Sequence, residues 1–321
     1  MPGGARGLCL SRGAVRIAHD PEKWEPVFGK DHAQKKHSMS AFDPRTTPAR
    51  PDLAASHLRG KVDAARFVDG TAHEVRDETA PLRREPAPDA PLDTEALHGE
   101  RVTVYETTEE GWCWGQLERD GYVGWLPANA LRPPGPPATH TVAALRTLVF
   151  PGPSIKLPPV AAFPLGSRLA VMRVDAALAV TASGYVPLRH LAPVDAPEPD
   201  FVAVAERFLG APYLWGGKTS LGIDCSGLVQ VALTAAGIAC PRDSDMQERA
   251  LGAAIAADVA KVQRGDLMFW KGHVAIVRDG ATLVHANAFH MSVAVEPIAE
   301  AVARIAAGGA AINAVKRLPP R

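Results

Sequence analysis

Residues 213–230 read YLWGGKTSLGIDCSGLVQ and place Cys225 where a glycine-rich loop turns into a helix. The apolar run after the cysteine, which ends at Gly237, predicts a buried helix that begins at Cys225. Free backbone N–H groups and the helix dipole at such a position lower the pKa of a thiol and can hold an oxyanion. Cys225 is therefore a candidate nucleophile. The alternative is an inert residue that fills a core, which is what most lone cysteines are.

The residues around this helix predict an α+β domain at 200–319. A first helix is expected from Phe201 to Gly210 with Asp200 as its N-cap, and a third over 244–254. Helices followed by a run of strands are typical of an α+β layout with an antiparallel sheet. The expected strands are 266–270, 273–280, 282–288, 291–298 and 312–318.

Two histidines fall on neighbouring strands of this predicted sheet. His273 begins HVAIV, and His285 lies within LVHANA, the next strand along the chain. A hairpin through RDGAT (278–282) would bring the two strands side by side, under the helix that carries Cys225. A cysteine nucleophile needs a base and a group that orients that base, so the layout permits Cys225, His273 and His285 to meet. A histidine on a strand is otherwise usually structural.

Two small β barrels are predicted before this domain, at 76–133 and 139–194. Their ends align as GYVGWLPANALRP (121–133) and SGYVPLRHLAPV (183–194), which indicates an internal repeat. The segment RPPGPPAT between them reads as a stiff linker. Three tryptophans of the first barrel are expected to pack in its core or at its rim, and Cys113 to face the other side of its strand; they are Trp112, Trp114 and Trp125.

The N-terminal residues differ from the rest. Residues 1–40 are polar and charged without sustained periodicity, which predicts a disordered tail, and Met39 is an alternative start. Residues 41–75 contain prolines and then a possible short helix. They predict an extended or helical lead-in that packs on a larger body.

Composition narrows the function classes. Lys+Arg and Asp+Glu both count 35, so no basic excess proposes nucleic acid or an anionic membrane as a partner. No signal peptide or membrane-spanning run is visible. The four cysteines lack a C-x-x-C pair, and four of the histidines (His98, His140, His190 and His290) lack ligand spacing. We therefore expect a cytoplasmic protein without metal or other cofactor; the sequence leaves the oligomeric state open.

Three motifs resemble one known family. YLWGGKTSLGIDCSGLVQ, GDLMFWKGHVAIV (265–277) and LVHANA (283–288) are similar to the NlpC family of papain-like cysteine peptidases, over about 200–318. The two β units resemble bacterial Src-homology-3-type barrels. The whole order resembles the cytoplasmic γ-D-glutamyl-L-diamino acid endopeptidases. That resemblance implies cleavage of the bond between γ-D-Glu and a diamino acid in murein-derived tri- or tetrapeptides that have a free N-terminal L-Ala.

The resemblance also implies roles for single residues. Cys225 would be the nucleophile, His273 the general base and acid, and His285 the residue that orients His273. The implied substrate-binding residues are Tyr213, Trp215, Asp224, Ser226, Asp243 and Ser244, with Glu85 and Tyr122 of the first barrel capping the amino end of the peptide.

Structural alternatives exist for several of these residues. Asp224 could cap the helix that starts at Cys225, and Asp243 and Ser244 could cap the helix that follows. Tyr213 and Trp215 could serve packing alone. Two other functions also stay open: a D,L-endopeptidase that acts on intact peptidoglycan with the barrels as wall anchors, and a non-catalytic scaffold whose barrels bind peptides.

Overall fold

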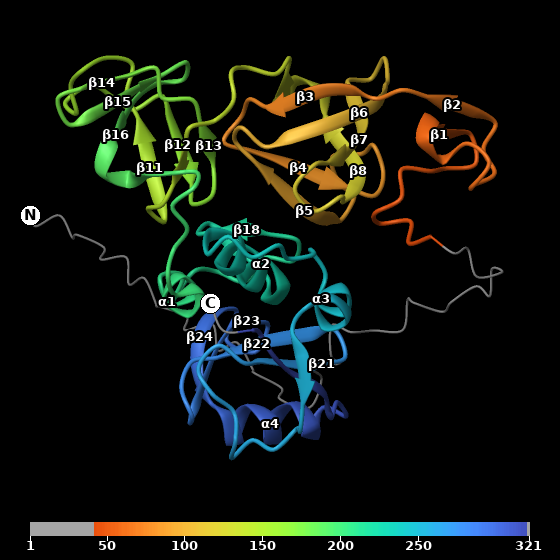
Figure 1. Ribbon diagram of the computed structural model, residues 1–321, viewed down its shortest axis with the longest axis vertical. Helices are drawn as coiled ribbons and strands as arrows, with labels where there is room; N and C mark the ends of the chain where they lie inside the picture. The colour runs from red at the N-terminus through yellow and green to blue at the C-terminus, as the bar shows by residue number, and fades with distance from the viewer. Residues whose placement is uncertain (1–41, 320–321) are drawn as a thin grey trace, which may run out of the picture. The chain divides into compact units, whose positions relative to one another are not determined.

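The structure is a computed structural model that describes residues 42–319 (Figure 1). The tail predicted at 1–40, with Cys9 and Met39, lies outside these residues. None of the helices in the described part of the chain is long and apolar enough to cross a lipid bilayer.

The C-terminal part is built on a six-stranded antiparallel sheet with the order β20-β25-β21-β22-β23-β24, which confirms the predicted antiparallel sheet. Helices α1 and α2 cover one face and α4 covers the other (Figure 1). The elements are α1 (Phe201–Glu206), β18 (Lys218–Thr219), β19 (Gly222–Ile223), α2 (Cys225–Ala235), α3 (Ser244–Ala250), β20 (Ala253–Ile255), β21 (Leu267–Trp270), β22 (His273–Val277), β23 (Thr282–Asn287), β24 (Ser292–Pro297), α4 (Ile298–Ala307) and β25 (Ile312–Arg317).

The central strands are apolar throughout because both of their faces are buried. Val274 and Ile276 of β22 pack in the core beneath α1 and α2. Ala275 and Val277 alternate with them and pack against α4 on the other face. Residues one position apart on a strand therefore serve two different cores.

Three elements differ from the sequence expectation. The helix expected to reach Gly210 ends as α-helix at Glu206, and four turn residues complete it. The third helix stops at Ala250 because Gly252 (φ +54°) turns the chain into β20, which pairs with β25. Helix α4 was not expected at all.

The first barrel is a seven-stranded sheet with the order β5-β4-β8-β7-β6-β3-β9. Its core contains Val102, Cys113 and Leu126. The strands are β3 (Thr71–Val75), β4 (Thr79–Arg83), β5 (Leu92–Leu97), β6 (Arg101–Thr107), β7 (Trp112–Leu117), β8 (Val123–Pro127) and β9 (Leu131–Arg132).

The lead-in before the barrel contributes to it directly. Its strands β1 (Leu53–Ala55) and β2 (Arg66–Val68) form a parallel pair, and Leu53 packs against Trp114. The Arg50 guanidinium stacks over the rings of Trp114 and Trp125, at 4.3 and 4.9 Å from the centroids. The lead-in thus covers Trp114 and Trp125 on the side of the sheet away from Cys113.

Two expectations about this region need correction. The possible helix in the lead-in is only a three-residue 3-10 turn, Ser56–Leu58. The sheet begins at Thr71, before the expected start at 76. β3 (TAHEV) lacks an apolar alternation of its own, and its pairing with β6 and β9 makes it a strand.

The second β unit consists of three small sheets, with the strand orders β13-β10-β17, β11-β12 and β14-β15-β16. Both aligned sequence ends adopt the same local structure, a strand, a 3-10 turn and a strand: β8, Ala128–Ala130 and β9 in the first unit, β16, Leu188–His190 and β17 in the second. The strands are β10 (His140–Val142), β11 (Arg146–Val149), β12 (Ala161–Pro164), β13 (Arg168–Leu169), β14 (Arg173–Asp175), β15 (Leu178–Thr181), β16 (Gly184–Pro187) and β17 (Leu191–Pro193).

The core beneath α2 makes a stability prediction. Leu233 on α2 is fully buried in that core, whereas Leu221 is 67% exposed. We expect Leu233→Ala to lower the free energy of unfolding by about 2–5 kcal/mol, because the lost side chain leaves a cavity. The control Leu221→Ala should stay within about 0.5 kcal/mol of the parent protein. Urea unfolding followed by tryptophan fluorescence measures both; equal values for the two variants would contradict the packing described for α2.

Candidate active site

Cys225 is the first residue of α2, as the sequence predicted, and is buried. The glycines before and after it permit a tight crossing of the chain. A Cβ added to Gly217 would lie 2.4 Å from the carbonyl oxygen of Gly222, and one added to Gly227 would lie 2.4 Å from that of Gly217. The loop and the helix start can therefore pack this closely only with glycine at both places.

Asp224 is the N-cap of α2, and its carboxylate is saturated with hydrogen bonds. Oδ1 accepts from the backbone N–H of Gly227 at 2.6 Å and from the Ser226 hydroxyl at 3.3 Å, and Oδ2 accepts from the N–H of Gly216 at 2.8 Å. Arg242 donates to both oxygens, at 3.0 and 2.7 Å. The capping alternative considered for Asp224 thus describes its side chain well.

Arg242 is the centre of this network and is only 1% exposed. Besides Asp224, its Nη1 donates to the Ser226 hydroxyl at 2.8 Å, and its Nε donates to Oγ1 of Thr94 on β5 at 2.8 Å. A buried guanidinium is tolerated only when its donors are paired in this way. Arg242 therefore joins the start of α2 to the first barrel.

The two predicted histidines meet and continue into a longer chain of hydrogen bonds. His273 Nε2 lies 3.0 Å from His285 Nδ1, and His285 Nε2 lies 3.0 Å from Oε2 of Glu296. Arg304 of α4 donates to both oxygens of Glu296, at 2.9 and 2.7 Å. Although burial opposes it, the hydrogen bond from His285 and the pairing with Arg304 lower the pKa of Glu296 to about 2.

An ionised Glu296 determines the proton positions along this chain. A carboxylate only accepts hydrogen bonds, so His285 donates from Nε2, and its Nδ1 is left as an acceptor. His273 must then carry its proton on Nε2, which leaves its Nδ1 free to accept one. This assignment follows from the hydrogen-bond network. The arrangement can hold His273 as a neutral base with a defined reactive nitrogen.

Cys225 lies close to the strand that carries the base. The backbone N–H groups of Ser226 and of Val274, the residue directly after His273, face its sulfur and act to lower the pKa of the thiol. The N–H of Cys225 itself makes no hydrogen bond with any residue of the described part of the chain, so it can bind an oxyanion.

The protonation of the thiol differs from the sequence expectation. Burial and then the Asp224 carboxylate raise the pKa of Cys225 to about 12. Burial, with smaller contributions from His285 and Arg304, lowers the pKa of His273 to about 3. The expected thiolate is thus replaced by a neutral thiol beside a neutral imidazole, because desolvation and the neighbouring carboxylate outweigh the helix dipole.

The two aromatic candidates differ in exposure. Tyr213 is partly buried against the core that contains Cys225, and burial raises the pKa of its hydroxyl, as does the nearby Cys225. Trp215 is 58% exposed, so packing alone does not explain it. Its place in the loop that leads to Cys225 makes its ring available to a ligand.

Residues of the first barrel and of the lead-in reach the start of α3. The Tyr122 hydroxyl donates to Oδ2 of Asp243 at 3.1 Å, and Arg45 donates to the same oxygen at 2.8 Å. Asp243 takes the N-cap position of α3 but makes no capping hydrogen bond with its side chain, and Ser244 is the first residue of α3. The side-chain capping alternative is therefore wrong for Asp243.

Glu85 is not brought to this cluster. It is exposed in the loop between β4 and β5, and its carboxylate pairs with no other described residue. Asp93 of β5 is the barrel acid whose charge acts on Tyr122. Asp93 follows Leu92 in an unremarkable strand sequence, which gave no signal for such a role.

One group of side chains has the spacing of metal ligands: ligand atoms of His285, His290 and Glu296 all lie within 4.8 Å of one another. Both ring nitrogens of His285 are already hydrogen-bonded, and Arg304 pairs with both oxygens of Glu296. The adjacent guanidinium opposes a cation there. These residues fit the histidine chain better than a metal.

The comparisons with known proteins agree with this geometry. Residues 210–306 match the model of the NlpC/P60 family, and residues 82–131 match that of the bacterial dipeptidyl-peptidase Sh3 domain. The chain carries an NlpC/P60 peptidase domain. Cysteine-type hydrolysis is the character of this family, so the chain is a cysteine peptidase. The Sh3 match falls within the first predicted barrel, and a second barrel of that type at 139–194 stays a prediction.

Relatives cover most of the chain. The gamma-D-glutamyl-L-lysine dipeptidyl-peptidase of Bacillus cereus is 27% identical over 64% of this chain and 71% of its own length. The protein of that name in Bacillus subtilis is 29% identical over 66% of this chain and 77% of its own. A crystal structure of an NlpC/P60 family protein from Bacillus cereus covers 78% of this chain and 100% of its own, with a TM-score of 0.66 and 22% identity. That likeness shows the fold of the NlpC/P60 domain and its barrel region.

The raised thiol pKa makes a prediction for alkylation. The thiolate is the reacting form, so the rate of Cys225 alkylation by iodoacetamide should rise about tenfold per pH unit from pH 6 to 9. Peptide mapping by mass spectrometry follows Cys225 separately from the buried Cys113 and Cys240, with N-acetylcysteine as the exposed reference. A rate that is constant between pH 5 and 8 would show a preformed thiolate instead.

Proposed function

We propose that the NlpC/P60 domain hydrolyses the bond between γ-D-Glu and the diamino acid of murein-derived tri- and tetrapeptides that have a free N-terminal L-Ala. The observation that carries the chemistry is the hydrogen-bond chain from Glu296 through His285 to His273, beside the buried Cys225. The names of the two Bacillus relatives support the substrate class. Free cysteines in the described part of the chain fit a reducing, cytoplasmic setting.

The catalytic cycle follows from the assigned proton positions. His273 Nδ1 takes the thiol proton as Cys225 Sγ attacks the γ-carbonyl carbon of D-Glu, and the N–H of Cys225 holds the oxyanion. His273 then gives this proton to the leaving amine of the diamino acid, which departs as the C–N bond breaks. In the second half, His273 takes a proton from water, and the hydroxide attacks the thioester carbonyl. The C–S bond then breaks, L-Ala-γ-D-Glu leaves as the acid, and His273 returns the proton to Sγ of Cys225. His285 is the residue that orients His273.

The amino end of the substrate would be recognised where the first barrel meets α3. Oδ1 of Asp243 makes no hydrogen bond with any described residue, while Tyr122 and Arg45 fix the other oxygen. A substrate ammonium could therefore pair with Oδ1 of Asp243 through a charge-assisted hydrogen bond. Such a closed end would select short peptides, because an extended N-terminal chain would clash and lose its hydrogen bonds.

This assignment changes the roles of several predicted residues. The carboxylate of Asp224 and the hydroxyl of Ser226 are occupied by Arg242, so they act by positioning Cys225. Asp93 replaces Glu85 as the barrel acid near Tyr122. Tyr213, Trp215 and Ser244 remain candidates for contact with the peptide, with the exposed Trp215 placed best to cover it.

Paired peptides test the proposal. L-Ala-γ-D-Glu-diaminopimelate should be cleaved at least about 100-fold faster than its N-acetylated form, because acetylation removes the charge that Asp243 binds. Asp243→Asn should abolish most of that preference. The matched control Asp245→Asn, an exposed acid of α3 that also pairs with Arg45, should keep it.

Cys225→Ala tests the nucleophile, and the acetylated peptide tests the capped pocket. No cleavage by this variant, with folding verified by circular dichroism, is the expected result, and retained cleavage would rule out the nucleophile. Equal rates on free and acetylated peptide would overturn the capped pocket only. Faster release of peptides from purified sacculi than from tripeptide would favour the activity on intact peptidoglycan.

A further inference from the structure

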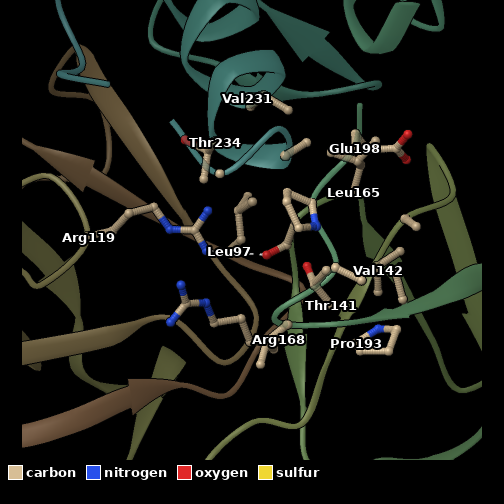
Figure 2. A pocket seen from close by; sticks show the side chains of 18 of the residues that line it. Leu97, Arg119, Thr141, Val142, Leu165, Arg168, Pro193, Glu198, Val231 and Thr234 are labelled. Carbon is tan, nitrogen blue, oxygen red and sulfur yellow. Dashed lines mark hydrogen bonds between the residues drawn. The ribbon is translucent and has the colours of Figure 1, made fainter. Parts of the chain in front are cut away.

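A cavity lies away from the candidate active site, where the first barrel, the second β unit and α2 come together (Figure 2). It encloses about 100 Å³. Its walls include Leu97 and Arg119 of the first barrel, Arg168 of the second unit, Glu198 of the connecting segment, and Lys218 and Gln230 of the peptidase domain.

Three cationic side chains line this cavity, and two of them lack a direct ion pair within the described residues. Arg119 pairs with the buried Glu100 at 2.8 Å, and Glu198 pairs with Arg207 at 2.7 Å, so both acids are already neutralised. Arg168 and Lys218 have no acidic partner within 4.0 Å in the described part of the chain. Acids act on these two cations only from beyond this distance: Glu100 acts on both of them, and Glu95 acts on Lys218.

Lys218 is the more unusual of the two. Its side chain is 2% exposed, and its Nζ makes no hydrogen bond with any described residue. A buried ammonium without a partner is costly, and native proteins normally satisfy such groups. Oε1 of Gln230, another residue of the cavity wall, is buried and unpaired as well. The cavity wall therefore offers an unpaired donor, Nζ of Lys218, and an unpaired acceptor, Oε1 of Gln230, to a ligand.

Arg119 and Arg168 also favour a negatively charged ligand in this cavity. The Arg119 side chain extends toward the other lining residues, while the exposed Arg168 side chain extends away from Thr141 and Pro193, to the side on which Arg119 lies (Figure 2). Burial, followed by repulsion from Arg119, lowers the pKa of Arg168. Nη2 of Arg119 is held by the carbonyl oxygen of Gly166 at 3.3 Å, which limits its ability to turn away. Like charges facing one cavity are stabilised when an anion lies between them.

We propose that this cavity is a binding site for a small oxyanion, a phosphate or carboxylate group, held by Lys218, Arg168 and Arg119. One water molecule needs only about 10–15 Å³ of cavity volume. The volume of about 100 Å³ therefore admits a group of phosphate size. Forked guanidinium donors match the geometry of phosphate and carboxylate oxygens. The site is separate from the catalytic chemistry and does not depend on the proposed substrate.

The place of Lys218 connects the cavity to the nucleophile loop. Lys218 pairs with Ile223 across the short β18–β19 hairpin, and Ile223 directly precedes Asp224. The N–H of Lys218 also donates to Glu95 of β5 at 2.7 Å. An anion bound at Nζ would therefore stabilise the segment on which the start of α2 rests.

Thermal unfolding of the full chain with inorganic phosphate tests the site, at constant ionic strength maintained with chloride. The melting temperature should rise with phosphate and saturate, since a ligand that binds only the folded state stabilises it. Isothermal titration calorimetry gives the affinity, and Arg168→Gln should weaken it at least about tenfold. The matched control Arg173→Gln, an exposed arginine of β14, should bind phosphate as the parent protein does.

Further variants and anions in the same measurements identify the class of ligand. Lys218→Met should lose the phosphate response; because this variant could fail to fold, the peripheral Arg168→Gln variant is the decisive one. Glycerol phosphate and acetate, tested in the same way, distinguish a phosphoryl group from a carboxylate. No saturable response to any of the three anions, or an equal response in the parent protein and Arg168→Gln, would overturn the proposal.

Discussion

The buried ion pair between Arg242 and Asp224 is the constraint on which the site depends. Neither charge could stay in the interior alone, so each fixes the other, and their remaining hydrogen bonds fix the surroundings. Asp224 caps α2 and holds the loop at Gly216, while Arg242 reaches Ser226 and Thr94 of the first barrel. The nucleophile therefore begins a helix whose start is anchored in two domains. Tyr122 and Asp243 meet on the same side because Asp243 directly follows Arg242.

A second constraint comes from the opposite face of the sheet. The ionised Glu296, paired with Arg304 of α4, determines which nitrogen of His285 carries its proton, and His285 in turn determines this for His273. In this way helix α4, on the face of the sheet opposite α2, determines the reactive nitrogen of the base. The neutral thiol and the neutral imidazole form a low-charge resting site. Charge would develop only when the proton moves, where the N–H of Cys225 is ready to stabilise it.

Much of this could be predicted from the sequence because it depends on local pattern. The helix start at Cys225 follows from the glycine loop and the apolar run, and the β22–β23 pairing near His273 and His285 follows from two apolar strands around an Asp-Gly turn. Helix α4 could also have been found, since Ile298, Ala301, Val302 and Ile305 have the spacing of a helix face. The residues that no local pattern reveals are Arg242, Thr94 and Asp93, which act across domains. The thiol pKa was mispredicted because burial and the position of the Asp224 carboxylate are tertiary properties.

The most direct test of the Arg242–Asp224 constraint is the kcat of Arg242→Lys on the free tripeptide. Lysine keeps the positive charge but cannot bridge Asp224, Ser226 and Thr94 together. The account predicts that kcat falls by about 100-fold, because the nucleophile is displaced, while KM changes little, since Asp243 and Tyr122 remain in place. The measurement is made at a temperature at which circular dichroism shows the variant folded. A kcat equal to that of the parent protein would contradict the claim that this ion pair positions Cys225.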